Sequence, residues 1–281
     1  MRRLMGIVNV TPDSFSDGGL YLDAEAAVAH GRELLAEGAD ILDVGGESTR
    51  PGAAAVDAAE ERRRTEPVVH ALAAEGATVS IDTSKAAVAE AALDAGARIV
   101  NDVTAFVAEP ELADLCAARG CGVVLMHMQG SPRTMQENPT YGDVVDDVRA
   151  FLVERVEFAT GRGVPEDSIW VDPGIGFGKT AEHNLELLRR LGELRAVGRP
   201  VMIGTSRKSF LGKLTGRDVS GRIGGTIASN VIALANGAEI FRVHDVGAVR
   251  DALIVAEAIL GRSDWGVDER FAREPAEAAG G

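Results

Sequence analysis

Three side chains that can accept hydrogen bonds stand where apolar runs of the chain end, and together they could recognise the edge of a flat heterocycle. Asp82 ends VSID, Asn101 follows RIV, and Asp172 ends SIWVD. A carboxylate pairs well with an N–H and an exocyclic NH₂ of an aminopyrimidinone, and an amide can donate or accept beside it. Any one of them could simply satisfy hydrogen bonds at a barrel rim. The three together favour a heterocycle site.

Two later segments carry cations that could bind an anion. GTSRKSFLG places Arg207 and Lys208 after an apolar run, and FRVHD places Arg242 and His244 two residues apart. Residues at i and i+2 share one face of a strand. Guanidinium and ammonium groups suit phosphate or carboxylate. His244 could instead be a buried core histidine, but its spacing from Arg242 favours a second anion-binding pair.

The segment NVTPDSFSDGG offers hard oxygen ligands. Asn9 ends an apolar run, and Asp13 and Asp17 follow on a loop rich in Pro, Gly and Ser. Hard oxygens near a phosphate suit Mg²⁺, which takes few protein ligands and keeps water and substrate oxygens. An ordinary turn stabilised by Asp and Asn side chains is the alternative for this segment.

Two glycine-rich segments complete the candidate chemistry. GGESTRPGA lets the backbone approach a ligand and adds Thr49 and Arg50, although it could equally be a solvated loop. DPGIGFGKT is not a Walker A loop, because the first Gly is missing at the required spacing. Phe177 in that segment could cover a ring or pack locally.

Eight apolar runs must position these residues. Runs rich in Val, Ile and Leu are typical of parallel strands that are buried on both faces. They predict strands near residues 4–9, 40–44, 78–82, 97–101, 122–126, 168–172, 200–204 and 239–243, with helices between them. Eight strands that alternate with helices predict a single (β/α)₈ TIM barrel, whose active site lies at the strand C-termini.

The lengths of the segments agree with that fold. The chain of 281 residues suits one barrel, which typically needs about 250 residues. We expect the barrel over residues 1–262, a helix at 24–37, and a weakly ordered tail at 263–281. Long loops, which often carry function, are expected at 11–22, 45–57, 127–142, 173–181 and 205–220.

Composition excludes several classes of protein. The net charge of −14 argues against a nucleic-acid partner, for which a basic patch is expected. The apolar stretch from Leu4 to Val10 is too short for a secretory signal or a membrane span, so we expect no membrane partner. Cys116 and Cys121 are too few for a disulfide framework, and a reduced cytoplasm is therefore expected.

The motifs together resemble bacterial dihydropteroate synthases. The matching segments are MGIVNVTPDSFSDGG, DVGGESTRPGA, SIDTSK, RIVNDV, LMHMQGSPRTMQ, DPGIGFGK, SRKSFLG and RVHDV, in order over roughly residues 4–260. The resemblance implies that p-aminobenzoate is joined to 6-hydroxymethyl-7,8-dihydropterin diphosphate with loss of pyrophosphate. It also implies Mg²⁺ as the cofactor and a homodimer.

The resemblance implies a role for each matching residue. It places Mg²⁺ at Asn9; the pterin at Asp82, Asn101, Asp172 and Lys208; the diphosphate at Thr49, Arg242 and His244; and p-aminobenzoate at Arg50, Pro51, Phe177 and Ser209. Asp13 would close over the site with the first loop, and Met126 joins the substrate-binding set. The catalytic group would be Asp13, Arg50, Lys208, Arg242 and His244. A dissociative, S_N1-like displacement follows, because the pterin ring can spread positive charge from its exocyclic CH₂.

The chain departs from the family pattern in three places. TAFVAEPEL follows Asn101-Asp102-Val103 where a Ser-Gly-Gly type stretch is common, Thr205 stands where Leu or Val is more usual, and GGTIASNVIALANG is an uncommon helix. Two rival functions are a methyltetrahydrofolate–corrinoid methyltransferase and a pterin-binding paralogue without turnover. The diphosphate residues and the STRPG loop disfavour the first, and the intact catalytic set disfavours the second. The late apolar helices could form the dimer interface or simply pack on the barrel.

Overall fold

The computed structural model describes residues 2–11, 19–49 and 52–262, and within the first helix the side chains from residue 24 onward. In these residues eight parallel strands form one sheet in the order β6-β5-β4-β3-β2-β1-β8-β7. They are β1 (Arg3–Asn9), β2 (Ile41–Gly45), β3 (Val79–Asp82), β4 (Ile99–Asp102), β5 (Gly122–Met126), β6 (Ile169–Asp172), β7 (Met202–Ile203) and β8 (Ile240–Val243). A bridge between Val171 and Val201 joins the two ends of the sheet, so the barrel is closed.

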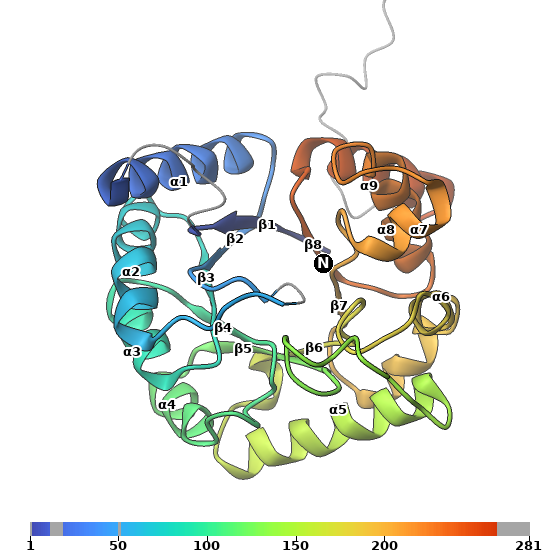
Figure 1. The fold of residues 1–281 in the computed structure, drawn as a ribbon, viewed down its shortest axis with the longest axis horizontal. Coiled ribbons are helices and arrows are strands. Elements are labelled where there is room, and N and C mark those ends of the chain that lie inside the picture. The colour runs from blue at the N-terminus through green and yellow to red at the C-terminus, as the bar shows by residue number, and fades with distance from the viewer. Residues whose placement is uncertain (1, 12–18, 50–51, 263–281) are drawn as a thin grey trace, which may run out of the picture.

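Helices surround this barrel (Figure 1). They are α1 (Gly19–Ala36), α2 (Ala58–Ala74), α3 (Ala86–Asp94), α4 (Glu111–Arg119), α5 (Val144–Gly161), α6 (Ala181–Arg189), α7 (Ser209–Thr215), α8 (Ile223–Ala235) and α9 (Val246–Ile259), with 3₁₀ turns η1 (Glu166–Ser168) and η2 (Leu191–Val197). Each observed strand overlaps a predicted range. The predicted single (β/α)₈ barrel is confirmed, whereas the boundary at residue 262 stays a prediction.

Two predicted loops are shorter than expected. The helix predicted from residue 24 begins at Gly19, because no residue between the two is a strong helix breaker. The loop predicted over residues 205–220 contains α7. This helix is only seven residues long, and a pattern that short does not stand out by periodicity alone.

The alternation of strand side chains explains how the barrel interior is layered. Met5, Ile41, Ile99, Val124, Met202 and Ile240 form one apolar cluster, against which Trp170 packs. Side chains two residues further along a strand point to the same face. Asp43, Asn101, Met126, Asp172 and Arg242 therefore lie one layer above this cluster, inside the barrel at its C-terminal mouth. The alternation of strand side chains thus places a polar layer at the barrel mouth and an apolar layer directly beneath it.

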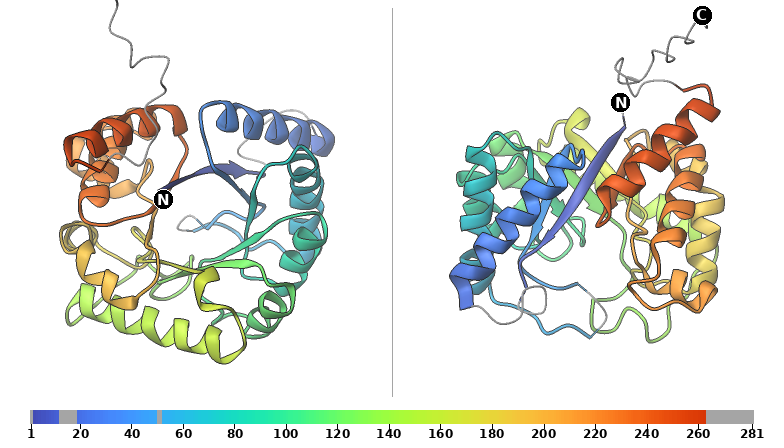
Figure 2. Two further views of the ribbon diagram at one scale, coloured as in Figure 1. Left: turned by 180° about the vertical axis from the view of Figure 1, so that it is seen from behind. Right: turned by 90° about the horizontal axis from the view of Figure 1, so that it is seen from above.

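At the opposite end of the barrel, two arginines near the N-terminus contact neighbouring elements. The Arg3 guanidinium lies 5.6 Å from the centroid of the Trp170 ring, a cation–π arrangement. Arg2 forms an ion pair with the buried Glu257 of α9. Figure 2 shows β1 running from the face that holds the N-terminus to the far face of the molecule. The polar layer therefore opens at the face opposite to the N-terminus.

Glycines form the joints between helices and strands, as the sequence predicts. Gly38, Gly76, Gly96 and Gly237 each follow a helix with φ between 89° and 109°, a backbone conformation that other residues rarely adopt. No helix in the part of the chain that the structure describes is both long and apolar enough to cross a membrane. Cys116 and Cys121 are buried free thiols.

Candidate active site

An arginine at the end of β8 connects two carboxylates across the barrel mouth. Arg242 Nε donates to Asp43 Oδ2 at 2.6 Å, and its Nη2 donates to Asp82 Oδ2 at 2.6 Å. Asn101 Nδ2 donates to the same Asp43 oxygen at 3.0 Å. The two predicted pterin readers Asp82 and Asn101 and the predicted anion-binding Arg242 are therefore held in one network.

Asp43 is the member of this network that the predicted site omits. Its side chain is fully buried, and its second oxygen, Oδ1, has no hydrogen-bond partner among the residues that the structure describes. The signal was present in the sequence, because Asp43 interrupts the apolar run ILDV in the same way as Asp82 and Asp172 end theirs. No shared role with the other carboxylates could be seen before the strands were brought together.

Burial controls the electrostatics of the mouth. It raises the pKa of Asp82 to about 7, with Arg242 opposing the rise and Asp43 adding to it. It also raises the pKa of Asp172. Burial lowers the pKa of Lys208 to about 8, against the attraction of Asp172. For Arg242, burial lowers the pKa but is outweighed by Asp43 and Asp82, so the net shift is upward. The mouth therefore favours a ligand that brings hydrogen-bond donors to its carboxylates.

Asp172, Lys208 and Arg242 converge on one small space beside Gly204. A Cβ atom built on Gly204 would lie 4.0 Å from Asp172 Oδ2, 4.0 Å from Lys208 Nζ and 3.9 Å from Arg242 Cβ. Asp172 Oδ1 accepts from the Gly174 N–H at 2.7 Å, which fixes the carboxylate. Lys208 Nζ lies 4.4 Å from the centroid of the Phe177 ring. These distances bring together two residues predicted to hold the pterin, Asp172 and Lys208, the diphosphate residue Arg242, and Phe177, which is predicted to frame p-aminobenzoate.

The other predicted residues lie around this group. Met126 is buried at the end of β5, and Ser209 is exposed at the start of α7. Asn9 ends β1 and is paired in register with Gly45, whose strand neighbour is Asp82. Thr49 is half-buried in the loop after β2. Asp13, Arg50 and Pro51 lie outside the described residues, so their predicted roles stay predictions.

Of the two cations after β7, Lys208 faces the mouth and Arg207 does not. Arg207 Nε donates to Asp245 Oδ2 at 3.0 Å. Its backbone is left-handed, with φ of 57°, and its N–H donates to Thr226 Oγ1 at 3.0 Å. His244 Nδ1 lies 3.0 Å from Ser206 Oγ. Arg207 therefore secures the loop, which leaves Lys208 free to point inward.

The segment after Val103, which departs from the family pattern, is held by hydrogen bonds to the carboxylate of Asp102. The carboxylate of Asp102 accepts from the N–H groups of Thr104 at 2.8 Å and Phe106 at 2.7 Å, and Phe106 is buried. Ala105 and Phe106 have φ of 52° and 64°, so two residues with side chains adopt a conformation that glycine prefers. The loop is a closed turn with its apolar residues in the core.

The other two departures contact each other. Thr205 Oγ1 accepts from Ser229 Oγ at 2.8 Å and from Asn230 Nδ2 at 3.1 Å. A hydroxyl in place of an aliphatic side chain on the loop is thus matched by polar residues on α8. The substitutions compensate one another and leave the polar layer of the mouth in place.

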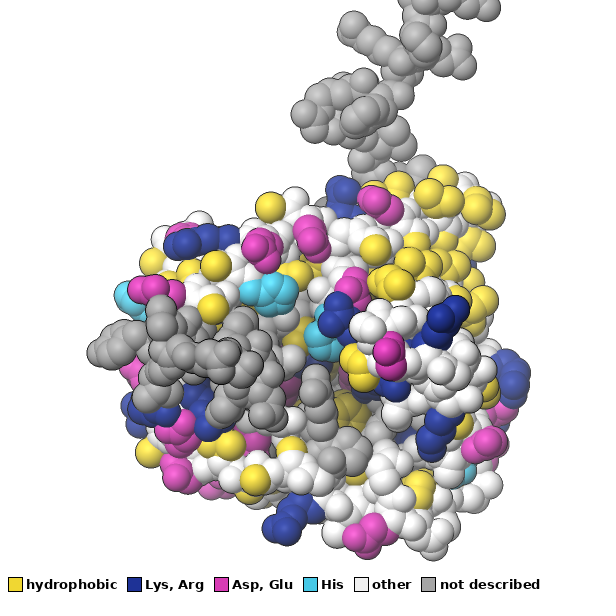
Figure 3. All heavy atoms as spheres, turned by 45° about the horizontal axis from the view of Figure 1, so that its top comes forward, with side chains coloured by type: hydrophobic (Ala, Val, Ile, Leu, Met, Phe, Trp, Pro, Cys, Tyr) yellow, Lys and Arg dark blue, Asp and Glu magenta, His cyan; other side chains and the backbone are white. Residues whose placement is uncertain are grey.

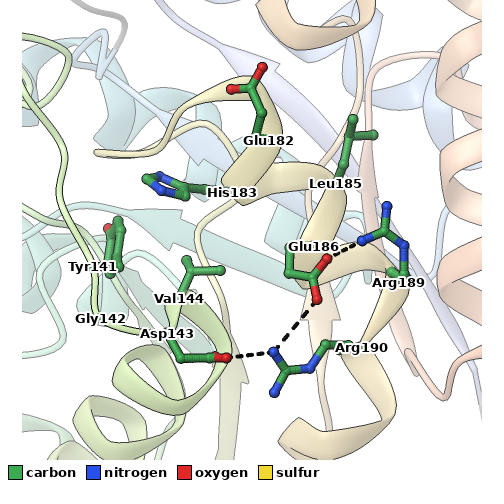
Figure 4. Close-up of a pocket in the computed structure, with 10 residues that line it drawn as sticks. All are labelled: Tyr141, Gly142, Asp143, Val144, Glu182, His183, Leu185, Glu186, Arg189 and Arg190. Atoms are coloured by element: carbon green, nitrogen blue, oxygen red, sulfur yellow. Dashed lines mark hydrogen bonds and ion pairs between the residues drawn. The ribbon is translucent and has the colours of Figure 1, made fainter.

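A pocket of about 450 Å³ lies between the start of α5 and α6 (Figure 4). Its charges are mutually paired, since Arg190 Nη1 contacts Asp143 Oδ2 at 2.7 Å and Glu186 Oε1 at 3.6 Å. None of the predicted site residues lines it. The barrel mouth is therefore the candidate active site.

The fold and the site define a class of protein. The pterin binding enzymes match residues 5–244, and the chain belongs to this family. Within the family it is similar to dihydropteroate synthases. That of Mycobacterium leprae is 50% identical over 265 residues, 92% of this chain and 93% of the relative. That of Neisseria meningitidis serogroup C is 49% identical over 261 residues, 92% of both chains.

Solved structures give the same result. Dihydropteroate synthase from Xanthomonas albilineans with 4-aminobenzoic acid superposes with a TM-score of 0.87 at 49% identity, over 92% of this chain and 93% of that chain. The resemblance that the motifs indicate is confirmed.

Proposed function

We propose that this protein condenses 6-hydroxymethyl-7,8-dihydropterin diphosphate with p-aminobenzoate, giving 7,8-dihydropteroate and pyrophosphate in folate biosynthesis. The observation that carries the proposal is the network of Arg242 with Asp43 and Asp82, set among Asn101, Asp172 and Lys208. Family membership and the names of the relatives support it. The chain is then a transferase.

The pterin fits the acceptors of the mouth. Asp172 and Asp82 accept from the ring N–H and exocyclic NH₂ groups, and Asn101 supplies an amide with both a donor and an acceptor. Lys208 donates to a ring oxygen or nitrogen. Binding replaces water by donors that are held in place, which offsets the cost of burying the carboxylates.

The diphosphate lies toward Thr49, Arg242 and His244, with Mg²⁺ at Asn9. The described residues contain no group of three or more His, Cys, Asp or Glu that could hold a metal. The amide oxygen of Asn9 nevertheless fits Mg²⁺, which prefers hard oxygen ligands, and Asn9 would hold the ion beside the diphosphate. When bound, Mg²⁺ would neutralise charge that develops on the leaving diphosphate.

The bond to diphosphate breaks before the new C–N bond is complete. The pterin ring delocalises the positive charge left on its exocyclic CH₂, and Arg242 and His244 stabilise the departing anion. The amine of p-aminobenzoate then attacks with its free lone pair, and the nitrogen afterwards releases one proton to water, so that no strong general base is needed. Phe177 and Ser209, with Arg50 and Pro51, frame that second substrate.

The experiment is product formation from the two substrates, with and without Mg²⁺, followed by mass spectrometry. Dihydropteroate formed only with Mg²⁺ supports both the reaction and the metal. No product from folded protein that still binds the pterin would refute the reaction and indicate a binding paralogue. Asn9→Ala should weaken Mg²⁺-dependent binding of pyrophosphate in calorimetry, a readout that needs no turnover.

We also propose that a second copy of the chain covers an apolar face on α8 and α9. Hydrophobic side chains gather at the corner of the molecule where these helices lie (Figure 3). Ile232, Val255, Ile259 and Leu260 are 52%, 59%, 79% and 41% exposed. An exposed group of apolar side chains on two packed helices is typical of an interface between copies.

Light scattering after gel filtration tests the homodimer. Val255→Glu with Ile259→Glu should convert a dimer into a monomer. Val153→Glu, at a residue of α5 that is 36% exposed and lies elsewhere, is the matched control and should change nothing. A wild-type monomer at micromolar concentration would refute the proposal. The cytoplasmic location expected from the cysteines stays a prediction.

A further inference from the structure

Four consecutive carbonyl groups in the loop after β6 each accept a hydrogen bond from a side chain. The acceptors and donors are Ile175 from Lys208, Gly176 from Gln136 at 2.7 Å, Phe177 from Lys179 at 2.9 Å, and Gly178 from Tyr141 at 2.6 Å. Connecting segments usually lie at the surface, where water can satisfy such groups. Here the backbone on both sides of Phe177 is held by the protein itself.

Lys179 is the most deeply buried of these donors. Only 2% of the residue is exposed, and its Nζ lies 2.8 Å from His127 Nδ1, 2.9 Å from the Phe177 carbonyl oxygen and 3.4 Å from that of His127. Burial lowers the pKa of Lys179 well below its ordinary value, whereas the three acceptors around its Nζ match the three N–H groups of the ammonium form. Burial, and then the nearby Lys179, lower the pKa of His127 to about 3, so the imidazole is neutral and can accept. Lys179 therefore links the loop to the end of β5.

Close backbone contact between the loops after β5 and β6 supports this link. A Cβ on Gly174 would overlap the carbonyl oxygen of His127, and one on Gly178 would overlap the backbone of Gln129. Both glycines also have positive φ, at 67° and 60°. Only glycine fits at either position, so the two loops pack backbone against backbone.

We infer that Gln136, Tyr141 and Lys179 are positioning residues that fix Phe177 for the aromatic second substrate. The inference rests on the proposed function, in which Phe177 frames p-aminobenzoate. The Phe177 ring lies against the Lys208 amine. A shift of the Phe177 backbone would therefore change the distance between this ring, which frames p-aminobenzoate, and Lys208, which binds the pterin. Asp82 and Asn101 are carried by β3 and β4 and keep their positions, whereas Asp172 ends β6 and is fixed by Gly174, three residues before Phe177.

The first test is Tyr141→Phe, which removes one hydroxyl. The ring keeps its edge contact with His183, at 4.9 Å between centroids, and both side chains are seen in Figure 4. Because one hydrogen bond is lost, the KM for p-aminobenzoate should rise roughly fivefold to tenfold, while the KM for the dihydropterin diphosphate stays within about twofold. Gln136→Ala should act in the same direction, since it releases the neighbouring carbonyl.

Lys179→Met should give the largest rise in the KM for p-aminobenzoate, with Lys213→Met, at an exposed lysine of α7, as the matched control. A purely structural role would lower the melting temperature and the active fraction, and both KM values would stay unchanged. If Lys179→Met does not fold, the KM for p-aminobenzoate of Tyr141→Phe and Gln136→Ala provides the test. Folded variants with an unchanged KM for p-aminobenzoate overturn the inference.

Calorimetric binding of p-aminobenzoate, measured in the presence of pterin and pyrophosphate, gives the same comparison without turnover. A wild-type protein that binds p-aminobenzoate but makes no product would contradict the proposed function and leave the role of the three residues measurable. Equal binding by wild type and all three variants would contradict that role. A wild type that binds no p-aminobenzoate would overturn both.

Discussion

Asp82→Asn should make the protein relatively more stable as the pH rises from 5 to 8. Burial raises the pKa of Asp82 from its ordinary value of 3.8 to about 7. The folded state then holds a proton that the unfolded state has lost, so wild-type stability falls with pH between these two values. A shift of about 3 units implies a loss of about 2.5 kcal/mol between pH 5 and pH 8. Asparagine has no such proton to lose.

The assay is urea denaturation of both proteins at pH 5, 6, 7 and 8. The free energy of unfolding of Asp82→Asn minus that of the wild type should grow by about 2.5 kcal/mol from pH 5 to pH 8. Most of this growth should occur below pH 7. Because the comparison is a difference, groups that titrate equally in both proteins cancel. Asp167→Asn, at an exposed residue of η1, is the control and should give a constant difference. A constant difference for Asp82→Asn as well would show that Asp82 is ionised throughout, and would refute the reasoning.

The same proton should affect the ligand. An ionised Asp82 accepts hydrogen bonds from the pterin, so pterin affinity should fall as the pH drops below about 7, by at most roughly tenfold per pH unit. Fluorescence titration of a pterin against the wild type measures this. The dependence of pterin affinity on pH should become weaker in Asp82→Asn, which should bind the pterin less tightly than the wild type above pH 7.

Three further results are expected. Asp172→Ala should weaken pterin binding by roughly tenfold to a hundredfold in calorimetry, because it removes a charged hydrogen-bond acceptor; unchanged affinity would sink that assignment. Ala105→Gly should raise the stability to urea by about 1 kcal/mol, since Ala105 has φ of 52°, and a destabilised variant would mean that this strain is absent. Gly174→Ala should yield little folded protein in a solubility assay, because its Cβ overlaps the His127 carbonyl oxygen, whereas Gly52→Ala, with open space around it, is the control.

The sequence by itself determined the fold, because a parallel barrel repeats one local pattern eight times. Each buried strand must be an apolar run, and each helix-to-strand joint needs a residue that tolerates positive φ, as at Gly38 and Gly96. The strand ends also allowed Asp82, Asn101 and Asp172 to be grouped at the barrel mouth, and the i, i+2 spacing placed Arg242 and His244 on one strand face. The eight motifs, each weak alone, made the family recognisable.

Only the tertiary structure decided which of those groups are neighbours. Arg242 contacts Asp43 and Asp82, which stand 199 and 160 residues away in the chain, and no local pattern specifies that pairing. The choice between Arg207 and Lys208 depended on Asp245 from another strand end. Two of the contacts that hold the backbone around Phe177, those from Gln136 and Tyr141, come from a different loop. Such contacts depend on barrel closure, which places side chains from distant segments within hydrogen-bonding distance.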